Sequence, residues 1–509
     1  MLNLLVKAVK QNPILKSSLT LGVIVASSKM FGYAEKMALA YYFGTNYLVD
    51  IYSVITAIVM SVFIFFREII EPAFLAPFLK ARSLGDEKGG WQLFTAFALF
   101  IFAITVMLSI IAYFRPLDLI DLFAPGFQEK ERLMAGKLIQ IAFPATIFLS
   151  LSTLTNITLN ALKIFAIPAS GDLIYKVLII TSLILLYESN GIYAAIIGML
   201  VGAFAKLIFH LSYLFRSLCF SYHLSKDYLA DAWKISWPLL IGVAFSQVNI
   251  LTENIFGSYM REGSISAMSY SKKLIELPVL IFPYILSVVV FPYLSELSIA
   301  KEKQKMSALL SKCLTWIVVI FLPLSIYFFI FSSEIVEVIF KRGAFNDSSV
   351  LLTANFFSVY AIGMVFFAIE TVLVIFYYAN ADTKTPIFIG ILCVIENILI
   401  TYVLVSLIGV TGIAFGLVIS KATKNIILLA LLTKQIKVCY RLVFSFIYKV
   451  TISALLTGVT VLAFRQFFQT HFQALQISKV LFLISVFILG AIVNWVSLSL
   501  FKIRDEMNV

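Results

Sequence analysis

Residues on which many enzymes and soluble domains depend are scarce in this chain. Its 509 residues include only four cysteines and three histidines, and charged residues make up 13% of the total. The cysteines show no C-x-x-C spacing and the histidines do not cluster, so neither a disulfide framework nor a zinc site is indicated. Soluble domains carry about 25% charged residues, and the composition therefore excludes an ordinary soluble protein.

The short motifs of common catalysts are also missing. The sequence contains no G-x-x-x-x-G-K-[ST] loop for a nucleotide, no H-E-x-x-H pair for zinc and no G-x-S-x-G nucleophile elbow. A membrane-embedded glycosyltransferase would need carboxylates near a large outer loop, and the loop 115–132 is short. We therefore expect a protein that is not an enzyme and holds no cofactor.

Apolar residues dominate instead, at 61% of the chain with a mean hydropathy of +1.00. A helix needs about 20 mostly apolar residues to cross a bilayer. About fourteen such segments are present, which predicts an all-α polytopic membrane protein. They lie near 17–44, 48–79, 91–114, 134–162, 170–188, 192–218, 235–260, 266–298, 307–332, 350–379, 386–408, 410–433, 446–464 and 479–501.

Basic residues give the chain a net charge of +12 and gather in alternate short connections. Connections rich in Lys and Arg are expected to face the cytoplasm, which places both termini inside. The same clustering accounts for the positive charge, so no nucleic acid is expected as a partner. Residues 1–16 have no A-x-A-like cleavage site and are expected to form an interfacial lead-in.

Two halves of the chain resemble each other at a shift of about 218 residues. The shift pairs Pro168 with Pro386, Gly191 with Gly409, Gly198 with Gly416 and Lys206 with Lys424. The outer loops 115–132 and 333–349 also look alike. Six spans per copy give both copies one orientation, as in parallel-repeat transporters. We expect two six-helix lobes, 1–218 and 219–434, around a central cavity, with two further helices in 435–509 forming a lipid-facing groove.

Charged residues inside the predicted spans are the first candidates for function. Each costs about 2.5–3.5 kcal/mol at a helix centre, so it should face a water-filled cavity or pair with another charge. Lys29 and Lys36 share one face of the first span, with Glu35 one residue off it. The candidates to bind a substrate are Lys29, Asp50, Arg67, Lys272, Lys273 and Glu276, with Glu35 and Lys36 as secondary cavity candidates.

A packing role for the same charges remains open. Helical spacing allows Arg67 to pair with Glu71, and Glu276 to pair with either Lys272 or Lys273. Other charges within spans are expected to be interhelical pairs or interfacial anchors; these are Lys176, Lys206, Glu370 and Lys424.

Oxygen-bearing side chains in three later spans suggest a cation site. Carboxylate, amide and hydroxyl oxygens are the hard ligands that such sites use. The candidates are Asn249, Glu253, Glu396, Asn397 and Thr411, which would bind Na⁺ or take up H⁺ to couple transport to a gradient.

Three stretches resemble the MurJ (MviN) family of lipid II flippases in the MOP exporter superfamily. They are Ala26 to Lys36 continuing to Asp50, Tyr270 to Pro278 followed by Phe291 to Ser295, and Tyr378 to Pro386. The resemblance implies a monomer of fourteen helices in the bacterial cytoplasmic membrane. Such a protein carries a polyprenyl-diphosphate-linked sugar, with lipid II as the leading substrate, to the outer leaflet by alternating access.

The resemblance also implies that cationic residues in the cavity receive the diphosphate. Asp50, Lys273 and Glu276 align with charged cavity positions of the family. Lysine replaces the usual arginine at 29 and 273, and Glu35 and Phe63 replace two more. These departures leave two alternatives: a flippase for another lipid-linked glycan, such as an O-antigen or exopolysaccharide unit, and an ion-coupled drug antiporter of the same superfamily.

Overall fold

Helices account for the architecture of the whole described chain. The computed structural model describes residues 13–215, 247–436, 440–471 and 479–500, together with residues 243 and 245, and no strand occurs among them. The chain divides into two compact units, Met1–Ile265 and Ser266–Val509. The expected all-α fold is confirmed.

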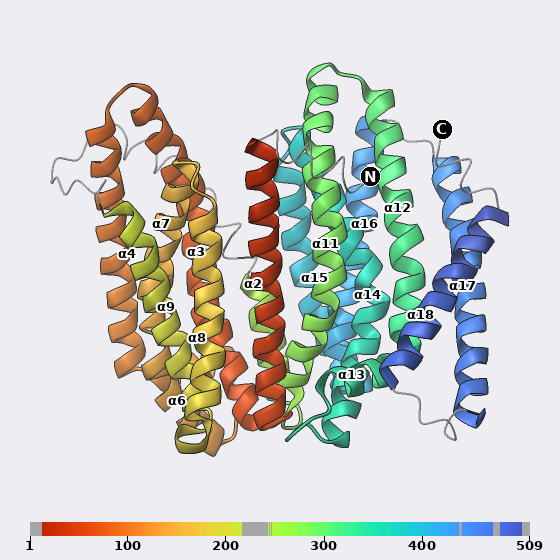
Figure 1. Ribbon diagram of the computed structural model, residues 1–509, viewed down its shortest axis with the longest axis horizontal. Helices are drawn as coiled ribbons and strands as arrows, with labels where there is room; N and C mark the ends of the chain where they lie inside the picture. The colour runs from red at the N-terminus through yellow and green to blue at the C-terminus, as the bar shows by residue number, and fades with distance from the viewer. Residues whose placement is uncertain are drawn as a thin grey trace. The chain divides into compact units, whose positions relative to one another are not determined.

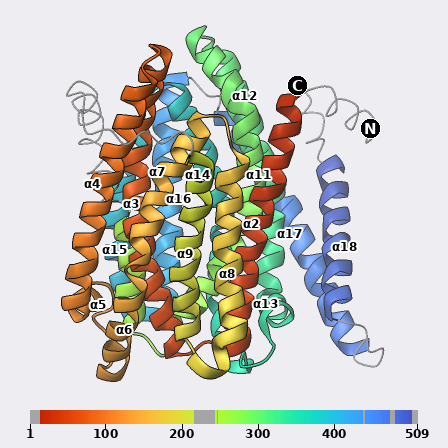
Figure 2. The same cartoon turned by 60° about the vertical axis from the view of Figure 1, so that its left-hand side comes forward.

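The first unit contains eight labelled helices (Figures 1 and 2). They are α2 (Pro13–Phe43), α3 (Tyr47–Ser83), α4 (Glu87–Phe114), α5 (Pro116–Phe123), α6 (Glu129–Ala142), α7 (Ala145–Ala161), α8 (Ala166–Asn190) and α9 (Tyr193–Leu214). Residues 247–258 are also helical. Helices α8 and α9 form an antiparallel hairpin, α9 and α3 both pack on α7, and α2 packs on α8.

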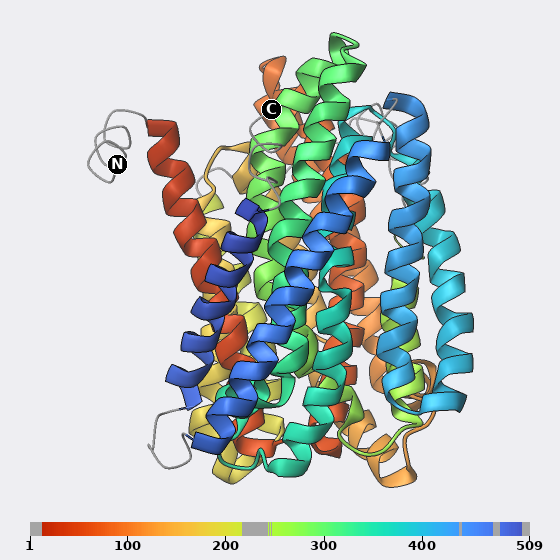
Figure 3. The same ribbon diagram turned by 90° about the vertical axis from the view of Figure 1, so that its right-hand side faces the viewer.

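The second unit contains the remaining helices. They are α11 (Ser264–Ile299), which begins just before the boundary, α12 (Lys303–Ile330), α13 (Ser332–Phe340), α14 (Asp347–Ala379), α15 (Lys384–Ile408), α16 (Thr411–Ile436), α17 (Tyr440–His471) and α18 (Lys479–Leu500). Helices α15 and α16 form a hairpin, α14 packs on α12 and α16, and the hairpin α17–α18 packs on α12 (Figure 3).

Ten of the described helices are long and apolar enough to cross a membrane, and the count is eleven if α6 and α7 form one bent span. Helices α2 and α11 have 31 and 36 residues and carry most of the charged candidates. The chain is therefore a multi-pass membrane protein, as predicted. The predicted span 235–260 lies partly outside the described residues.

Helix boundaries repeat along the chain with the shift that relates the two halves of the sequence. The shift carries the first and last residues of α8 onto those of α15, and the first residue of α9 onto that of α16. Gly191 and Gly409 end the paired helices α8 and α15, both with positive φ, of 54° and 69°. Short helices α5 and α13 lie at the two loops, 115–132 and 333–349, that look alike in sequence. The duplication thus extends to the boundaries of helices and to a backbone conformation that favours glycine.

One helix differs between the two copies. Helix α14 is continuous over Asp347–Ala379, whereas the same stretch of the first copy is divided into α6 and α7, which are bent by 42°. The predicted single span 134–162 is therefore two helices. Pro144 stands at the break and lacks the N–H that a continuous helix needs, while its counterpart in the second copy is Ile362. The proline at this position of the first copy is consistent with the break, although α3 and α12 continue through prolines of their own.

Close approach within the hairpin α8–α9 depends on glycine. A Cβ atom on Gly198 would lie 2.8 Å from the Cα of Ile179 and 2.8 Å from the Cβ of Ser182. Small residues allow helix backbones to approach in this way in membranes, where apolar burial gives no drive between helices. Gly390, in α15, has only the end of the flexible Lys424 side chain within reach, at 3.6 Å.

We expect Gly198→Ala to destabilise the protein, because the added methyl group forces α8 and α9 apart. Gly390→Ala is the matched control, since its methyl group makes only ordinary van der Waals contact with the end of the Lys424 side chain and the variant gains about 1 kcal/mol of helix propensity. Thermal unfolding of the detergent-purified variants should give a lower midpoint for Gly198→Ala and an unchanged or higher one for Gly390→Ala. Equal midpoints would contradict the close-approach argument.

Candidate functional site

A buried ion pair joins α2 to α8. Glu35 is 3% exposed, and the Nζ of Lys176 donates a hydrogen bond to its Oε2 at 2.6 Å. The hydroxyl group of Tyr52, on α3, donates to the Oε1 of Glu35 at 3.0 Å. Glu35 was a secondary cavity candidate, and its contacts are those of an interhelical packing pair. The expectation that Lys176 forms an interhelical pair is confirmed.

Lys29 and Lys36, both on α2, lie in different surroundings. Lys29 is exposed, whereas Lys36 is half-buried and its Nζ lies 6.0 Å from the centre of the Tyr52 ring. A cation over an aromatic face is stabilised by the ring quadrupole. Lys36 therefore belongs to the same cluster as Glu35, Tyr52 and Lys176. Of these two lysines, Lys29 has the more exposed side chain.

Asp50 fixes a turn near the start of α11. Its side chain is buried, and its Oδ2 accepts a hydrogen bond from the backbone N–H of Gly263 at 2.7 Å. Gly263 has φ of +85°, and a Cβ there would approach the carbonyl oxygen of Thr45 to 2.8 Å. Glu262, next to it, accepts from the backbone N–H of Tyr47 at 3.0 Å. Asp50 thus ties this turn to the start of α3.

A polar cavity of about 200 Å³ lies inside the first unit, among α3, α7, α8 and α9. It is lined by Phe63, Arg67, Glu71, Thr153, Asn156, Ile157, Asn160, Asp172 and Lys206. Arg67 and Glu71 are exposed, and the i,i+4 ion pair that the spacing allows between them is not formed in the described structure. Arg67, which the sequence analysis named as a candidate to bind a substrate, therefore lines this cavity.

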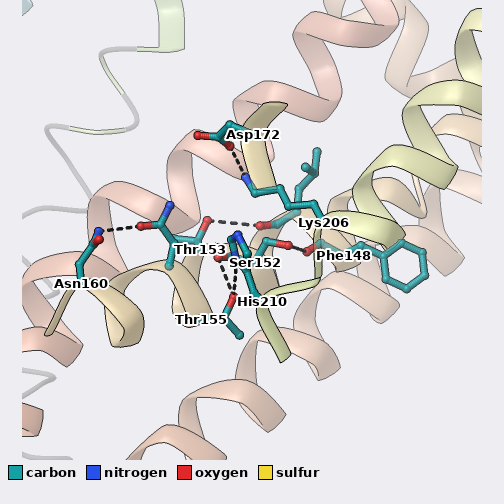
Figure 4. A network of polar contacts seen from close by, with 10 residues as sticks. Phe148, Ser152, Thr153, Thr155, Asn160, Asp172, Lys206 and His210 are labelled. Atoms are coloured by element: carbon teal, nitrogen blue, oxygen red, sulfur yellow. Dashed lines mark hydrogen bonds and ion pairs between the residues drawn. The ribbon is translucent and has the colours of Figure 1, made fainter. Parts of the chain in front are cut away.

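Lys206, on α9, belongs to the lining and contacts Asp172 on α8 (Figure 4). Its side chain is 4% exposed, and its Nζ donates to the Oδ1 of Asp172 at 2.6 Å and lies 5.5 Å from the centre of the Phe63 ring. His210, one turn further along α9, is fully buried and its Nδ1 lies 2.9 Å from the hydroxyl group of Thr155. The expected interhelical pairing of Lys206 is confirmed.

Most of the cavity was not predicted from the sequence. Asp172, Thr153, Asn156 and Asn160 were not candidates, although Asn156 and Asn160 are hydrogen-bonded to each other at 2.8 Å. The available signal was helical spacing: Asn156 and Asn160 stand four residues apart, and so do Arg67 and Glu71. Polar residues four apart on two apolar helices indicate polar faces, but not that these faces meet.

In the second unit, Lys273 and Glu276 of α11 form the predicted i,i+3 ion pair. The Nζ of Lys273 lies 2.6 Å from the Oε2 of Glu276, and their side chains are 17% and 34% exposed. The Nζ of Lys272 lies 5.7 Å from the centre of the Tyr360 ring. Both side chains of the pair therefore remain partly exposed.

Glu370 joins α14 to α16 through two lysines. Its carboxylate oxygens lie 2.7 Å from the Nζ of Lys421 and 2.6 Å from that of Lys424. All three side chains are at most 24% exposed. The expected interhelical role of Glu370 and Lys424 is confirmed, and the cluster carries a net positive charge.

The cation-site candidates are divided between the two units. Asn249 and Glu253 lie in the first, and Glu396, Asn397 and Thr411 lie in the second. Glu396 accepts a hydrogen bond from Thr423, at 2.8 Å, which is twelve residues along α16 from Thr411. At 1.5 Å per residue this is about 18 Å. The structure does not bring Thr411 to Glu396, and no group of three His, Cys, Asp or Glu suited to a metal occurs within the described residues.

An apolar cavity of about 300 Å³ lies in the second unit between α12 and the hairpin α17–α18. Its lining includes Pro323, Tyr327, Val461, Ala491 and Trp495. Ion pairs of Arg465 with Glu334 and of Lys479 with Glu337 join the hairpin to α13. The groove expected at the last two helices is thus present as an apolar cavity.

Long apolar helices whose charges pair across helices or line cavities define a polytopic α-helical membrane protein, and solved structures share its fold. A solved lipid II flippase MurJ in an inward closed conformation has a TM-score of 0.81 at 22% identity, over 96% of this chain and 100% of that one. An inward-facing MATE family multidrug resistance transporter of the MOP superfamily has a TM-score of 0.69 at 11% identity, over 82% and 98%. These two likenesses show a shared fold.

Sequence comparison gives the family. The model of the family described as lipid II flippase MurJ matches residues 39–483, and the chain belongs to this family. The protein named "Probable lipid II flippase MurJ" of Buchnera aphidicola subsp. Schizaphis graminum is 26% identical over 387 residues, 74% of this chain and 75% of that protein. The protein of that name from Borreliella burgdorferi is 26% identical over 414 residues, covering 77% and 78%.

We expect Glu35→Gln to destabilise the protein strongly, because it leaves the Lys176 ammonium without its carboxylate. Breaking a buried pair by removing one partner costs about 3–5 kcal/mol. The double variant with Glu35→Gln and Lys176→Gln should lose less than the single variant, since no unpaired charge remains. Chemical unfolding of the purified proteins measures this, and a double variant that is as unstable as the sum of both single variants would contradict the pairing.

Proposed function

We propose that this protein moves lipid II, a polyprenyl-diphosphate-linked sugar used to build peptidoglycan, from the inner to the outer leaflet of the bacterial cytoplasmic membrane. The observation that carries the proposal is the family match over residues 39–483. The curated relatives named lipid II flippases cover about three quarters of the chain. The fold shared with MOP transporters supports alternating access as the mode of transport.

We further propose the complete architecture that the sequence predicts. The ten clear spans, the bent pair α6–α7, the charged helices α2 and α11 and the predicted span 235–260 together make fourteen helices. These would form two six-helix lobes, 1–218 and 219–434, followed by two helices in 435–509. Both termini would be cytoplasmic, and the protein would act as a monomer without catalysing a reaction.

Recognition of the substrate requires cations for its diphosphate. Moving an uncompensated diphosphate into hydrocarbon is prohibitive, so the transport path must supply positive charge. The proposed contacts are the exposed Lys29 on α2 and the half-buried Lys273 on α11. Lysine offers a point charge where arginine would make a two-pronged contact, so these contacts depend on distance more than on orientation.

The ion pair of Lys273 with Glu276 is proposed as a switch. The Nζ of Lys273 lies 2.6 Å from the Oε2 of Glu276, so its charge is neutralised by a carboxylate of the same helix. An arriving diphosphate competes with Glu276 for Lys273, and its departure restores the pair. Asp50 would play the second switching part, because its Oδ2 accepts from the backbone N–H of Gly263 and so holds the turn that precedes α11. Coupling to Na⁺, to H⁺ or to the membrane potential would supply the energy.

Lys273→Ala should abolish rescue of a strain depleted of its own lipid II flippase, because the substrate diphosphate loses its cation on α11. Lys273→Arg should retain rescue, since it keeps the charge. The matched control is Lys303→Ala, which removes one lysine at the start of α12 and should rescue fully. Membrane abundance is measured for each variant. Full rescue by Lys273→Ala at normal abundance would refute the assignment.

The apolar cavity between α12 and the hairpin α17–α18 is proposed to hold part of the polyprenyl chain. It is lined mainly by apolar side chains, and its lining includes two glycines, Gly458 and Gly490. A chain of this chemistry binds through burial of apolar surface, at roughly 25 cal/mol per Å². The headgroup and the chain of one substrate would then be held by different parts of the protein.

Ala491→Phe should reduce transport by filling this cavity. Ile492→Phe is the control, because Ile492 is 54% exposed on the same helix and does not line the cavity. Transport is followed as labelled lipid II reaching the outer leaflet of spheroplasts. Loss of transport by the control, or normal transport by Ala491→Phe, would contradict a role of this cavity in binding the chain.

A further inference from the structure

The polar cavity of the first unit, described above with Arg67 and Lys206 in its lining, has an unusual balance of charge. Two cations, Arg67 and Lys206, face two carboxylates, Glu71 and Asp172, so the lining is formally neutral. Two amides and a threonine supply further donors and acceptors. Polar groups of this number are costly inside a membrane protein and usually mark a functional site.

A structural requirement of the fold does not explain these residues. The shift between the two copies places Ile285 at the position of Arg67, Val289 at that of Glu71, and Gly390 at that of Asp172. Asn156 and Asn160 correspond to Val374 and Tyr378. The second copy builds the same helices without this polar lining, and its Lys424 pairs with Glu370 on a different helix. The polar lining is therefore particular to the first unit.

The charge balance argues against the diphosphate as the occupant. Lys206 is already neutralised by Asp172 at 2.6 Å, and Glu71 lies one turn from Arg67 on the same helix. An anion would meet no net positive charge. A group that carries both an ammonium and a carboxylate would instead find a partner for each in Glu71 and Arg67, without breaking the pair of Lys206 with Asp172.

Size and position fit one end of a larger molecule. The cavity of about 200 Å³ is smaller than the roughly 300 Å³ at which pockets for whole drug-sized ligands begin. Asn160 lies near the end of α7 and Asp172 near the start of α8, so the cavity lies close to the connection that contains Lys163. The charge pattern of the sequence predicts this connection to be cytoplasmic, the side on which the substrate enters.

We propose that this cavity binds the peptide part of the lipid II headgroup through its charges of opposite sign. The exposed Arg67 receives a carboxylate of the peptide, and the exposed carboxylate of Glu71 receives its amino group. Asn156 and Asn160 are suited to hydrogen bonds with peptide groups. The inference rests on the proposed function and adds to it a second contact, separate from the diphosphate contact at Lys273.

The test is direct binding to the full-length purified protein. The probes are a synthetic Ala-γGlu-Lys-Ala-Ala peptide with free lysine and C-terminus, the same peptide acetylated on lysine, and inorganic pyrophosphate. Titration should give saturable binding of the free peptide and at least tenfold weaker binding of the acetylated one. Pyrophosphate should not displace the peptide. Displacement by pyrophosphate, or equal binding of both peptides, would overturn the proposal.

Variants locate the binding to the cavity. Arg67→Gln and Glu71→Gln should each weaken binding of the free peptide at least fivefold, and both residues are exposed, so folding should be retained. Glu68→Gln is the matched control, because Glu68 is an exposed carboxylate on the same helix that does not line the cavity. Thermal midpoints verify folding. Peptide binding unaffected by Arg67→Gln, or weakened equally by Glu68→Gln, would overturn the site.

The outcome is separable from that of the proposed function. Rescue of a depleted strain by Lys273 variants tests lipid II transport, whereas peptide binding to Arg67 and Glu71 variants tests the cavity. Normal rescue by Lys273→Ala with Arg67-dependent peptide binding would refute the diphosphate contact and leave the cavity assignment in place. Loss of rescue by Lys273→Ala, together with no binding of the peptide, would support the diphosphate contact and refute the cavity assignment.

Discussion

The structure depends on the cost of placing charge in hydrocarbon. Each ionised side chain within a span must find an opposite charge, an aromatic face or a polar cavity. The first solution joins α2 to α8 through Glu35 and Lys176, the second places Lys36 over Tyr52, and the third gathers Arg67 and Lys206 around a cavity. The helices that carry charge are thereby connected to specific neighbours, so the same groups that raise the cost of insertion also specify the packing.

Duplication supplied the framework, and divergence within it distinguishes the two copies. Helix boundaries that recur at one constant shift, and glycines with positive φ at Gly191 and Gly409, show a common backbone plan. Charged residues do not follow this plan, since Lys206 pairs with Asp172 on α8 while Lys424 pairs with Glu370 on α14. The backbone was retained because helix length is fixed by the bilayer, whereas side chains inside each copy were free to acquire different chemistry.

Sequence reasoning succeeded where the signal is local. Span positions follow from runs of apolar residues, the duplication from the spacing of proline and glycine, and the pairing of Lys273 with Glu276 from helical spacing. It failed where partners come from distant helices. Nothing in the sequence links Glu35 to Lys176, 141 residues away, or brings Asn160 and Asp172 to Arg67. The break at Pro144 was also missed, because an apolar run extends across it and proline is common in membrane helices.

The bend between α6 and α7 makes the two copies mechanically unequal. A continuous helix such as α14 transmits a push along its axis as a rigid rod, whereas a helix interrupted at a proline has a joint at which its two segments can change their angle. A conformational change that strains both copies will therefore change the angle between α6 and α7, at Phe143 and Pro144, before it bends α14 in the second copy.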